Sequence, residues 1–246
     1  MRKQLLVSVI AAWSVVSFAQ KGVRESCEAT TPPTIDGNAG EWTADWNLDG
    51  ESKILYNFCN DAENLYVRLK FTDDLTQRKI AMYGLYIKFD ASGKKKGKVG
   101  LKYPIGKDDR DLKKEKPVEL PDAAAVEAYK RQMLGDVEVV ELIGLAKEGI
   151  MASRLGLANG IEVLITPDEN ANYIYEAKIP FKAFGIDKSK TPVLGITIET
   201  GRQTAANQPA SAAPPAQGFG QRGFAGGGGY SILAVPAYLW VGLKLK

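Results

Sequence analysis

The chain has 246 residues and a formal net charge of +3, from 32 Lys and Arg against 29 Asp and Glu. A balance this close to neutral gives no case for nucleic-acid binding, which calls for a concentrated basic face. The chain contains no histidine, which excludes His-dependent zinc sites, Ser-His-Asp triads, Cys-His pairs and His-ligated haem. Carboxylate chemistry and calcium sites with oxygen ligands remain open.

The N-terminus has the pattern of a secretory signal peptide. Arg2 and Lys3 form a short basic region, and residues 5–18 then run without an ionisable side chain. This apolar stretch is too short to span a bilayer, which needs about 20 apolar residues. A small residue at Ala19 before a polar break predicts cleavage there. We therefore expect a signal peptide at 1–19 and a mature protein in the periplasm, at the cell surface or outside the cell. A buried helix or strand of the fold is the alternative for this stretch.

Two cysteines, Cys27 and Cys59, remain in the mature chain. In an oxidising compartment such a pair is interpreted first as a disulfide. Two separate buried thiols are the alternative, because one sequence does not show whether the two side chains approach within bonding distance.

Strands with alternating apolar and polar residues make up most of the mature chain. Ser52–Phe58 and Leu65–Thr72 flank the polar turn Asn60–Asn64, which predicts a hairpin. Further strands are expected at Met82–Asp90, Val137–Leu145, Ile161–Thr166, Tyr173–Ile179, Val193–Thr200 and within Ser231–Leu245. No segment after the N-terminal stretch is apolar enough to span a membrane.

Two segments interrupt this strand pattern. Asp122 is placed to cap a short helix over Ala123–Leu134, with Gly135 ending it. Residues 205–229 consist mainly of Gly, Ala, Pro, Gln and Ser, and such a composition predicts a long mobile loop. The sequence thus predicts an all-β fold, with residues 20–246 forming one domain with insertions at about 107–149 and 205–229. The domain is expected to be an antiparallel β-sandwich of jelly-roll or immunoglobulin-like type, with one short inserted helix.

Four short motifs follow one another along the mature chain. They are Thr34–Gly37 with Glu41 and Trp42, the segment Asp61–Asp74, the segment Tyr175–Phe181, and Leu194–Ile198. In their order and spacing the chain resembles the family 9 carbohydrate-binding modules and their secreted relatives. The resemblance covers most of the mature chain. It implies a β-sandwich whose sugar-binding members use aromatic side chains and polar groups at one end, often with structural calcium.

Aromatic residues are the first candidates for holding a sugar, because a pyranose stacks its apolar C–H face on a ring. Trp46 lies in a polar segment, where exposure would leave its ring open to a ligand. Trp42 belongs to the first motif, and a plain core role is its alternative. Tyr103 and Tyr83 are secondary candidates for the same role.

Carboxylates supply the other candidates. Asp73 and Asp74 are expected to close a strand, where they would bind ligand hydroxyls or calcium, or simply be solvated. Asp61 and Glu63 are weak candidates for a structural calcium ion, and a capped turn explains them equally well.

These observations suggest three hypotheses for the function. The first is a secreted, non-catalytic carbohydrate-binding module-like protein whose partner is a polysaccharide or oligosaccharide. The second is a structural or interaction protein of the cell envelope that keeps the sandwich without binding sugar and reaches a partner protein through residues 205–229. The third, a glycan-active enzyme, is disfavoured because nothing in the sequence selects the pair of carboxylates that glycoside hydrolysis needs.

Overall fold

The computed structural model describes residues 23–42, 44–107, 120–135, 137–145, 150–153, 160–204 and 232–246. The predicted signal peptide at 1–19 and the predicted loop at 205–229 lie outside these residues. Of the predicted insertion at 107–149, residues 108–119, 136 and 146–149 also lie outside them. Within the described ranges, no helix has the length and apolar character needed to cross a membrane.

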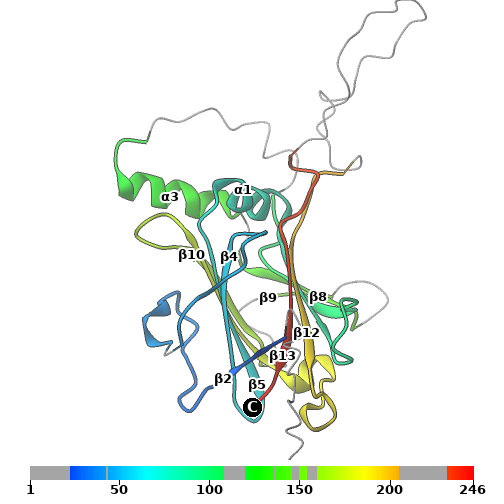
Figure 1. The fold of residues 1–246 in the computed structure, drawn as a ribbon. Coiled ribbons are helices and arrows are strands. Elements are labelled where there is room, and N and C mark those ends of the chain that lie inside the picture. The colour runs from blue at the N-terminus through cyan, green and yellow to red at the C-terminus, as the bar shows by residue number, and fades with distance from the viewer. Residues whose placement is uncertain are drawn as a thin grey trace, which may run out of the picture.

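Two β-sheets pack face to face, which confirms the predicted β-sandwich (Figure 1). In order across it, the front sheet holds seven strands: β1 (Val23–Glu25), β13 (Tyr238–Lys244), β12 (Leu194–Thr200), β6 (Leu85–Asp90), β7 (Val99–Lys102), β8 (Val139–Ile143) and β9 (Ile150–Ser153). The back sheet holds six: β10 (Glu162–Pro167), β11 (Tyr173–Pro180), β5 (Asn64–Phe71), β4 (Ile54–Asn60), β2 (Cys27–Glu28) and, also on β4, β3 (Asn47–Leu48). Neighbours are antiparallel except β1 on β13 and β2 on β4.

The core lies between the sheets and follows from the alternation along each strand. In the predicted hairpin, now β4 and β5, the inward residues Ile54, Phe58 and Leu69 are almost fully buried. In β6 the inward residues Ile87 and Phe89 are buried in the same core. Because the side-chain period of a strand is two, the intervening residues of β6 point away from the core. The front sheet therefore carries polar and aromatic side chains on its outer face.

One helix was predicted and two α-helices are described. The predicted helix is α3 (Ala123–Met133), where Asp122 accepts a hydrogen bond from the amide of Ala125 at 2.8 Å. The other, α1 (Asp74–Tyr83), begins where a strand end was expected. Both helices lie at the same end of the sandwich (Figure 1). Three short 3-10 turns complete the described elements: η1 (Ala39–Glu41), η3 (Phe181–Phe184) and η4 (Lys188–Lys190).

The first turn of α1 explains why Asp73 does not end a strand. The carboxylate of Asp73 accepts hydrogen bonds from the amide and the hydroxyl of Thr76, both at 2.9 Å. This is an N-cap, which satisfies amide donors that a helix otherwise leaves unpaired. Burial raises the pKa of Asp73, but the hydrogen bonds from Thr76 and the charge of Lys53 outweigh it and lower that pKa below its ordinary value.

Asp73→Ala is expected to lower the free energy of unfolding by about 1 kcal/mol, because it removes this cap. The folded pKa of Asp73 lies below its unfolded value, so the contribution is present at neutral pH and is lost as the pH falls through the folded value. Urea unfolding at neutral and acidic pH measures both effects. Asp74→Ala is the control, since that side chain is 91% exposed and should change stability by less than about 0.5 kcal/mol. Equal losses in the two variants would contradict the role of Asp73.

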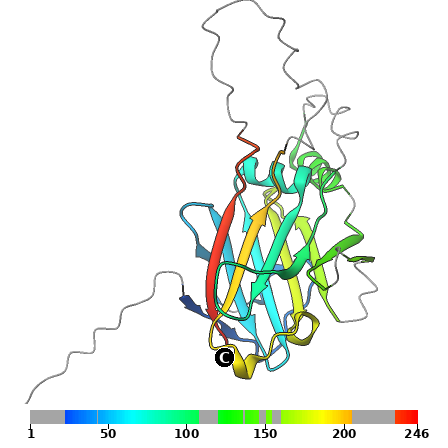
Figure 2. The same cartoon turned by 90° about the vertical axis from the view of Figure 1, so that its right-hand side faces the viewer.

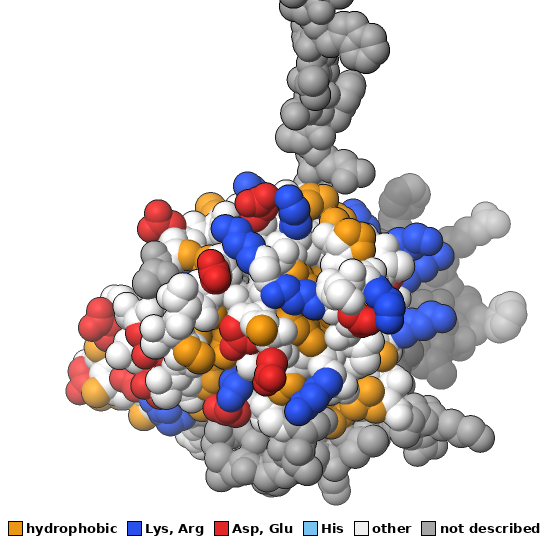
Figure 3. Space-filling view, turned by 90° about the horizontal axis from the view of Figure 1, so that it is seen from below, with side chains coloured by type: hydrophobic (Ala, Val, Ile, Leu, Met, Phe, Trp, Pro, Cys, Tyr) orange, Lys and Arg blue, Asp and Glu red, His pale blue; other side chains and the backbone are white. Residues whose placement is uncertain are grey.

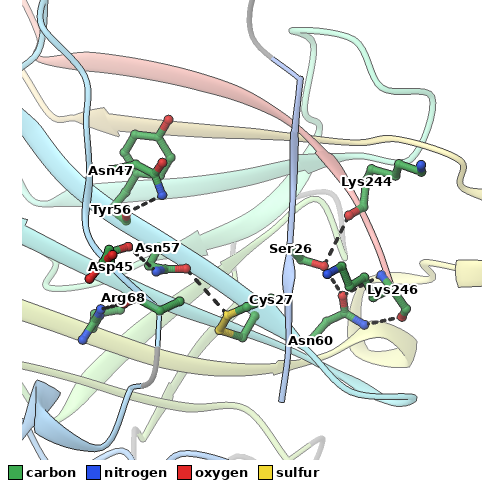
Figure 4. Close-up of a disulfide and its surroundings, with 12 residues drawn as sticks. Ser26, Cys27, Asp45, Asn47, Tyr56, Asn57, Asn60, Arg68, Lys244 and Lys246 are labelled. Carbon is green, nitrogen blue, oxygen red and sulfur yellow. Dashed lines mark hydrogen bonds between the residues drawn. A yellow bond between two sulfur atoms is a disulfide. The ribbon is translucent and has the colours of Figure 1, made fainter. Parts of the chain in front are cut away.

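The predicted disulfide between Cys27 and Cys59 is present and joins β2 to β4 (Figure 4). Directly before it, Ser26 is buried where the chain passes from the front sheet to the back sheet. The Ser26 hydroxyl donates to the side-chain oxygen of Asn60, and the Asn60 amide donates to the carbonyl of Lys246 at 2.7 Å (Figure 4). These bonds tie the first and last strands of the described chain together.

Candidate ligand-binding site

The two tryptophans proposed from the sequence lie on the outer face of the back sheet, and both contact one arginine. Trp42 is only 7% exposed, and its indole N–H donates to a carboxylate oxygen of Glu176 at 2.9 Å. The guanidinium of Arg68 lies 3.9 Å from the ring centroid of Trp46 and 5.1 Å from that of Trp42. Trp42 is therefore buried in a small cluster with Cys59 and Tyr66, separate from the core between the sheets. Trp46 is half-buried, with Arg68 over one face of its ring.

The other aromatic and acidic candidates are placed apart from these tryptophans. Tyr103 is fully buried, its hydroxyl donates to the carbonyl of Val137 at 3.0 Å, and so its ring has no face open to a sugar. Asp73 caps α1, and the exposed Asp74 pairs with Lys130 at 2.9 Å. The described structure does not bring these residues together with Trp46 into one site.

Asp61 and Glu63 lie in the turn between β4 and β5. The carboxylate of Asp61 accepts hydrogen bonds from the amides of Glu63 and Asn64 at 2.7 and 2.6 Å, and from the hydroxyl of Tyr66 at 2.7 Å. These are the bonds of a capped turn, which was the alternative explanation. In the described ranges, no group of three or more Cys, Asp or Glu side chains is placed to hold a metal ion.

A groove of about 760 Å³ opens on the outer face of the front sheet, and of the candidates from the sequence Tyr83 alone lines it. We call it the Tyr86 groove. Its floor is formed by the adjacent strands β12, β6 and β7, at the end of the sandwich where α1 lies. Its walls are formed by the segments that connect these strands to neighbouring elements. The lining residues are Met82, Tyr83, Tyr86, Lys88, Lys102, Ile105, Gly106, Lys107, Glu199, Thr200, Gly201, Arg202 and Thr204.

Strand register sets the floor of the groove. Glu199 of β12 lies opposite Tyr86 of β6, and Tyr86 lies opposite Lys102 of β7. Lys88 follows Tyr86 on the same face of β6, because side chains two positions apart share a face. An aromatic ring thus stands at the centre of a row of charged groups.

Electrostatics within the groove involve both signs of charge. The ammonium of Lys88 lies 3.3 Å from a carboxylate oxygen of Glu199. The ammonium groups of Lys88 and Lys102 lie 4.9 and 5.2 Å from the ring centroid of Tyr86. Burial, together with Glu141 and Glu199, raises the pKa of Tyr86, so its hydroxyl stays protonated at neutral pH. Burial lowers the pKa of Lys102, and Glu141 offsets part of that effect.

Close backbone contacts build the wall of the groove. A Cβ atom at Gly84 would lie 2.5 Å from the carbonyl oxygen of Pro104, and one at Gly201 would lie 2.1 Å from that of Tyr83. Only glycine permits such approaches. Gly84 also has a φ of +83°, which side chains other than glycine rarely adopt. These two glycines let the connections at the ends of α1, β7 and β12 meet beside Tyr86.

The lower part of the same face is covered by the loop between β6 and β7, which crosses in front of the sheet in Figure 2. The indole N–H of Trp240 donates to the carbonyl of Lys94 in this loop at 3.3 Å. Lys95 of the loop lies over the same indole ring, 5.0 Å from its centroid. The loop does not cover the Tyr86 groove, because no residue of the loop lines it.

The strand pattern contained one signal for this groove. Tyr86 and Lys88 lie at outward positions of a predicted strand, where a large aromatic residue has no core to fill. The order of strands in the sheet is what brings Glu199 and Lys102 to either side of Tyr86, and the sequence does not specify that order.

Comparison with solved structures gives similar chains, among them two carbohydrate-binding modules of family 9 from Caldicellulosiruptor kristjanssonii. The one in complex with glucose is 10% identical, with 91% of this chain and 96% of that chain covered and a TM-score of 0.36. The one in complex with cellotriose is 11% identical, with 75% and 80% covered and a TM-score of 0.34. Both belong to the family that the sequence resembles. No family model matches the chain, and no curated protein matches its sequence.

Proposed function

We propose that the protein is a secreted, non-catalytic module that binds a saccharide in the Tyr86 groove. The observation that carries this proposal is the row formed by Glu199, Tyr86 and Lys102 on the floor of an open groove. Secretion rests on the signal-peptide pattern at residues 1–19.

A saccharide needs two kinds of contact, and the groove offers both. The ring of Tyr86 supplies an apolar surface with a polar tip, which suits the C–H face of a pyranose. The carboxylate of Glu199 accepts hydrogen bonds from sugar hydroxyls, and the ammonium groups of Lys88 and Lys102 donate to them. The volume of about 760 Å³ lies within the range of ordinary small-ligand sites.

The spacing of carboxylates supports binding rather than hydrolysis. Among the described lining residues, Glu199 is the one acidic side chain. The next carboxylate along the same row is Glu141 of β8, which lies opposite Lys102. Three strand spacings separate Glu199 from Glu141, or about 14 Å between backbones. Glycosidases hold their two carboxyl groups roughly 5–10 Å apart.

Tyr86→Ala is expected to weaken saccharide binding at least about tenfold, because it removes the stacking surface. Isothermal calorimetry with a panel of plant and bacterial polysaccharides first identifies a ligand, and then compares the variants. Trp46→Ala serves as the comparison, since Trp46 is the half-buried tryptophan candidate on the other sheet. It should leave the affinity within about twofold.

The comparison distinguishes the possible sites. If Trp46→Ala abolishes binding and Tyr86→Ala does not, the site lies on the back sheet. If no polysaccharide in the panel gives a binding signal, the proposed function is wrong. Tyr86 is half-buried outside the core, so circular dichroism and thermal unfolding should show that the alanine variant still folds.

A further inference from the structure

Basic side chains outnumber acidic ones in the lining of the Tyr86 groove. Among the lining residues that the structure describes, Lys88, Lys102, Lys107 and Arg202 are basic, and Glu199 is acidic. A concave surface lined mainly by one sign of charge concentrates ligands of the opposite sign. The groove is therefore suited to a ligand that carries negative charge.

Lys102 shows most directly that a negative group fits here. Within the described residues, no carboxylate or carbonyl accepts a hydrogen bond from its ammonium, which instead lies over the ring of Tyr86. Lys88, by contrast, is paired with Glu199 at 3.3 Å. Burial lowers the pKa of Lys102, and the carboxylate of Glu141 on the neighbouring strand offsets only part of that effect, so the charged form of Lys102 still lacks some of the stabilisation that it would have in water. An anionic group beside Lys102 would restore that stabilisation.

The positions of the two ammonium groups also disfavour a neutral sugar. Both lie about 5 Å from the ring centroid of Tyr86, so they occupy the surface on which a sugar would stack. A neutral pyranose would have to displace at least one of them and would return only C–H contacts and neutral hydrogen bonds. An anionic sugar would give the displaced ammonium a charge-assisted hydrogen bond, which is roughly twice as strong.

Basic side chains are also concentrated outside the groove, on the same side of the molecule. The loop beside the groove adds Lys94, Lys95, Lys96 and Lys98, whose side chains are exposed. Seen from below, acidic side chains gather on the left of the molecule and basic ones on the right (Figure 3). In the orientation of Figure 1 the outer face of the front sheet is on the right, and Figure 2 turns that side to the viewer. The exposed lysines of this loop therefore add positive charge to the face on which the groove lies.

From these contacts we infer that the Tyr86 groove selects a saccharide that carries an anionic group, either a carboxylate or a sulfate ester, and that Lys102 is the residue that binds this group. The inference rests on the proposed function, since it names the class of saccharide for the same groove.

The experiment compares anionic sugars with neutral counterparts of the same backbone. Oligogalacturonate is compared with its methyl ester, which removes the carboxylate charge, and sulfated dextran oligosaccharides are compared with unmodified dextran oligosaccharides. Calorimetry at physiological salt measures the affinities. At least one anionic member is expected to bind about tenfold or more tightly than its neutral counterpart, and the preferred pair tells carboxylate from sulfate.

Variants of Lys102 test the assigned residue. Lys102→Met removes the charge with little change in volume and is expected to weaken binding of the anionic sugar about tenfold or more. Lys102→Arg keeps the charge and should remain within about threefold of the parent. Lys182→Met, an exposed lysine near the other end of the sandwich, is the control and should have no effect.

Each outcome bears on a different part of the inference. If a neutral sugar binds as tightly as its anionic counterpart, and Tyr86→Ala still abolishes binding, the inference is overturned and the proposed function stands. If Lys182→Met weakens binding as much as Lys102→Met, the attraction is unspecific and Lys102 is not the residue. If no sugar of either charge binds, the proposed function fails as well.

Discussion

Arg68→Met is expected to lower the free energy of unfolding by about 3–5 kcal/mol, a large part of the 5–15 kcal/mol that stabilises a typical domain. Arg68 is 3% exposed, and in the strand register it lies opposite Glu176, which is fully buried. Removing the guanidinium would leave the Glu176 carboxylate buried without its neighbouring positive charge. The loss of one partner from a buried pair of opposite charges is among the costliest single changes.

The stacked position of Arg68 adds a second contribution. Its guanidinium lies against the rings of both Trp42 and Trp46 and donates a hydrogen bond to the carbonyl of Ala44 at 2.7 Å. Glu176 accepts hydrogen bonds from the indole of Trp42 and the amide of Gly37 at 2.9 and 2.8 Å. Arg68 and Glu176 therefore hold the chain segment before β3 on the outer face of the back sheet, and Arg68→Met should loosen that segment.

A double-mutant cycle separates the charge pair from general loss of packing. Glu176→Gln keeps the shape of the side chain and an acceptor oxygen, so Arg68→Met in that background should cost less than in the parent. Lys178→Met is the control on β11, because its side chain is 31% exposed and its ion pair with Glu162 should contribute less than about 1 kcal/mol. Urea unfolding followed by tryptophan fluorescence measures the four proteins of the cycle and the control. No coupling in the cycle, or a cost for Arg68→Met as small as the control, would contradict this account.

The pH dependence of stability provides an independent check on Glu176. Burial raises its pKa above the ordinary value of 4.5, and the hydrogen bonds from Gly37 and Trp42 reduce this increase. A carboxyl group whose folded pKa is above its unfolded pKa stabilises the fold below the unfolded value, and this contribution is lost as the pH rises through the folded value. The unfolding free energy of Glu176→Gln should therefore fall less than that of the parent protein as the pH rises from 4.5.

Local sequence patterns were enough to predict much of the sandwich. The β4–β5 hairpin follows from alternating apolar residues on both sides of an Asn- and Asp-rich turn, and these signals lie within one short segment. Asp122 predicted the start of α3 in the same way. Asp73 carries a similar capping signal for α1, but its position directly after a strand made the end of that strand the simpler interpretation. In the structure Asp73 is the N-cap of α1.

Long-range pairing explains what the sequence did not predict. Trp42 could be placed in a motif, but its burial depends on Glu176, which lies 134 residues further along the chain. Arg68 occupies an outward position of β5 and is buried because the segment before β3 covers it. The Tyr86 groove likewise needs the order β12, β6, β7 across the front sheet. Alternation along one strand tells which face a residue occupies, and not which strands lie beside it.

Replacing both Cys27 and Cys59 with alanine is expected to lower the free energy of unfolding by about 3–4 kcal/mol. The two residues are 32 positions apart, and releasing a loop of that size gives the unfolded chain back this much conformational entropy. This range overlaps the one expected for Arg68→Met, but the disulfide stabilises a different part of the fold.

The effect should concentrate on the first strands. β1 and β2 have only three and two residues, and each pairs in parallel with one neighbour. Besides the disulfide and the strand pairing, the side-chain contacts of Ser26 with Asn60 and the carbonyl of Lys244, and the exposed ion pair of Glu25 with Lys244, hold this segment. Without the covalent link these few contacts must offset the ordering entropy of the whole segment. Local opening of β1 and β2 should then precede global unfolding.

Hydrogen exchange and thiol titration test the disulfide in the intact protein. The parent should show no free thiol until a reductant is added, and reduction should lower its stability by about as much as the double alanine variant. Amide exchange should accelerate in β1 and its partner β13 and in β2 and its partner β4, while β5 and β11 in the middle of the back sheet remain protected. Two titratable thiols in the untreated protein would overturn the pairing. Uniform acceleration across both sheets would show that the disulfide supports the whole sandwich rather than its first strands.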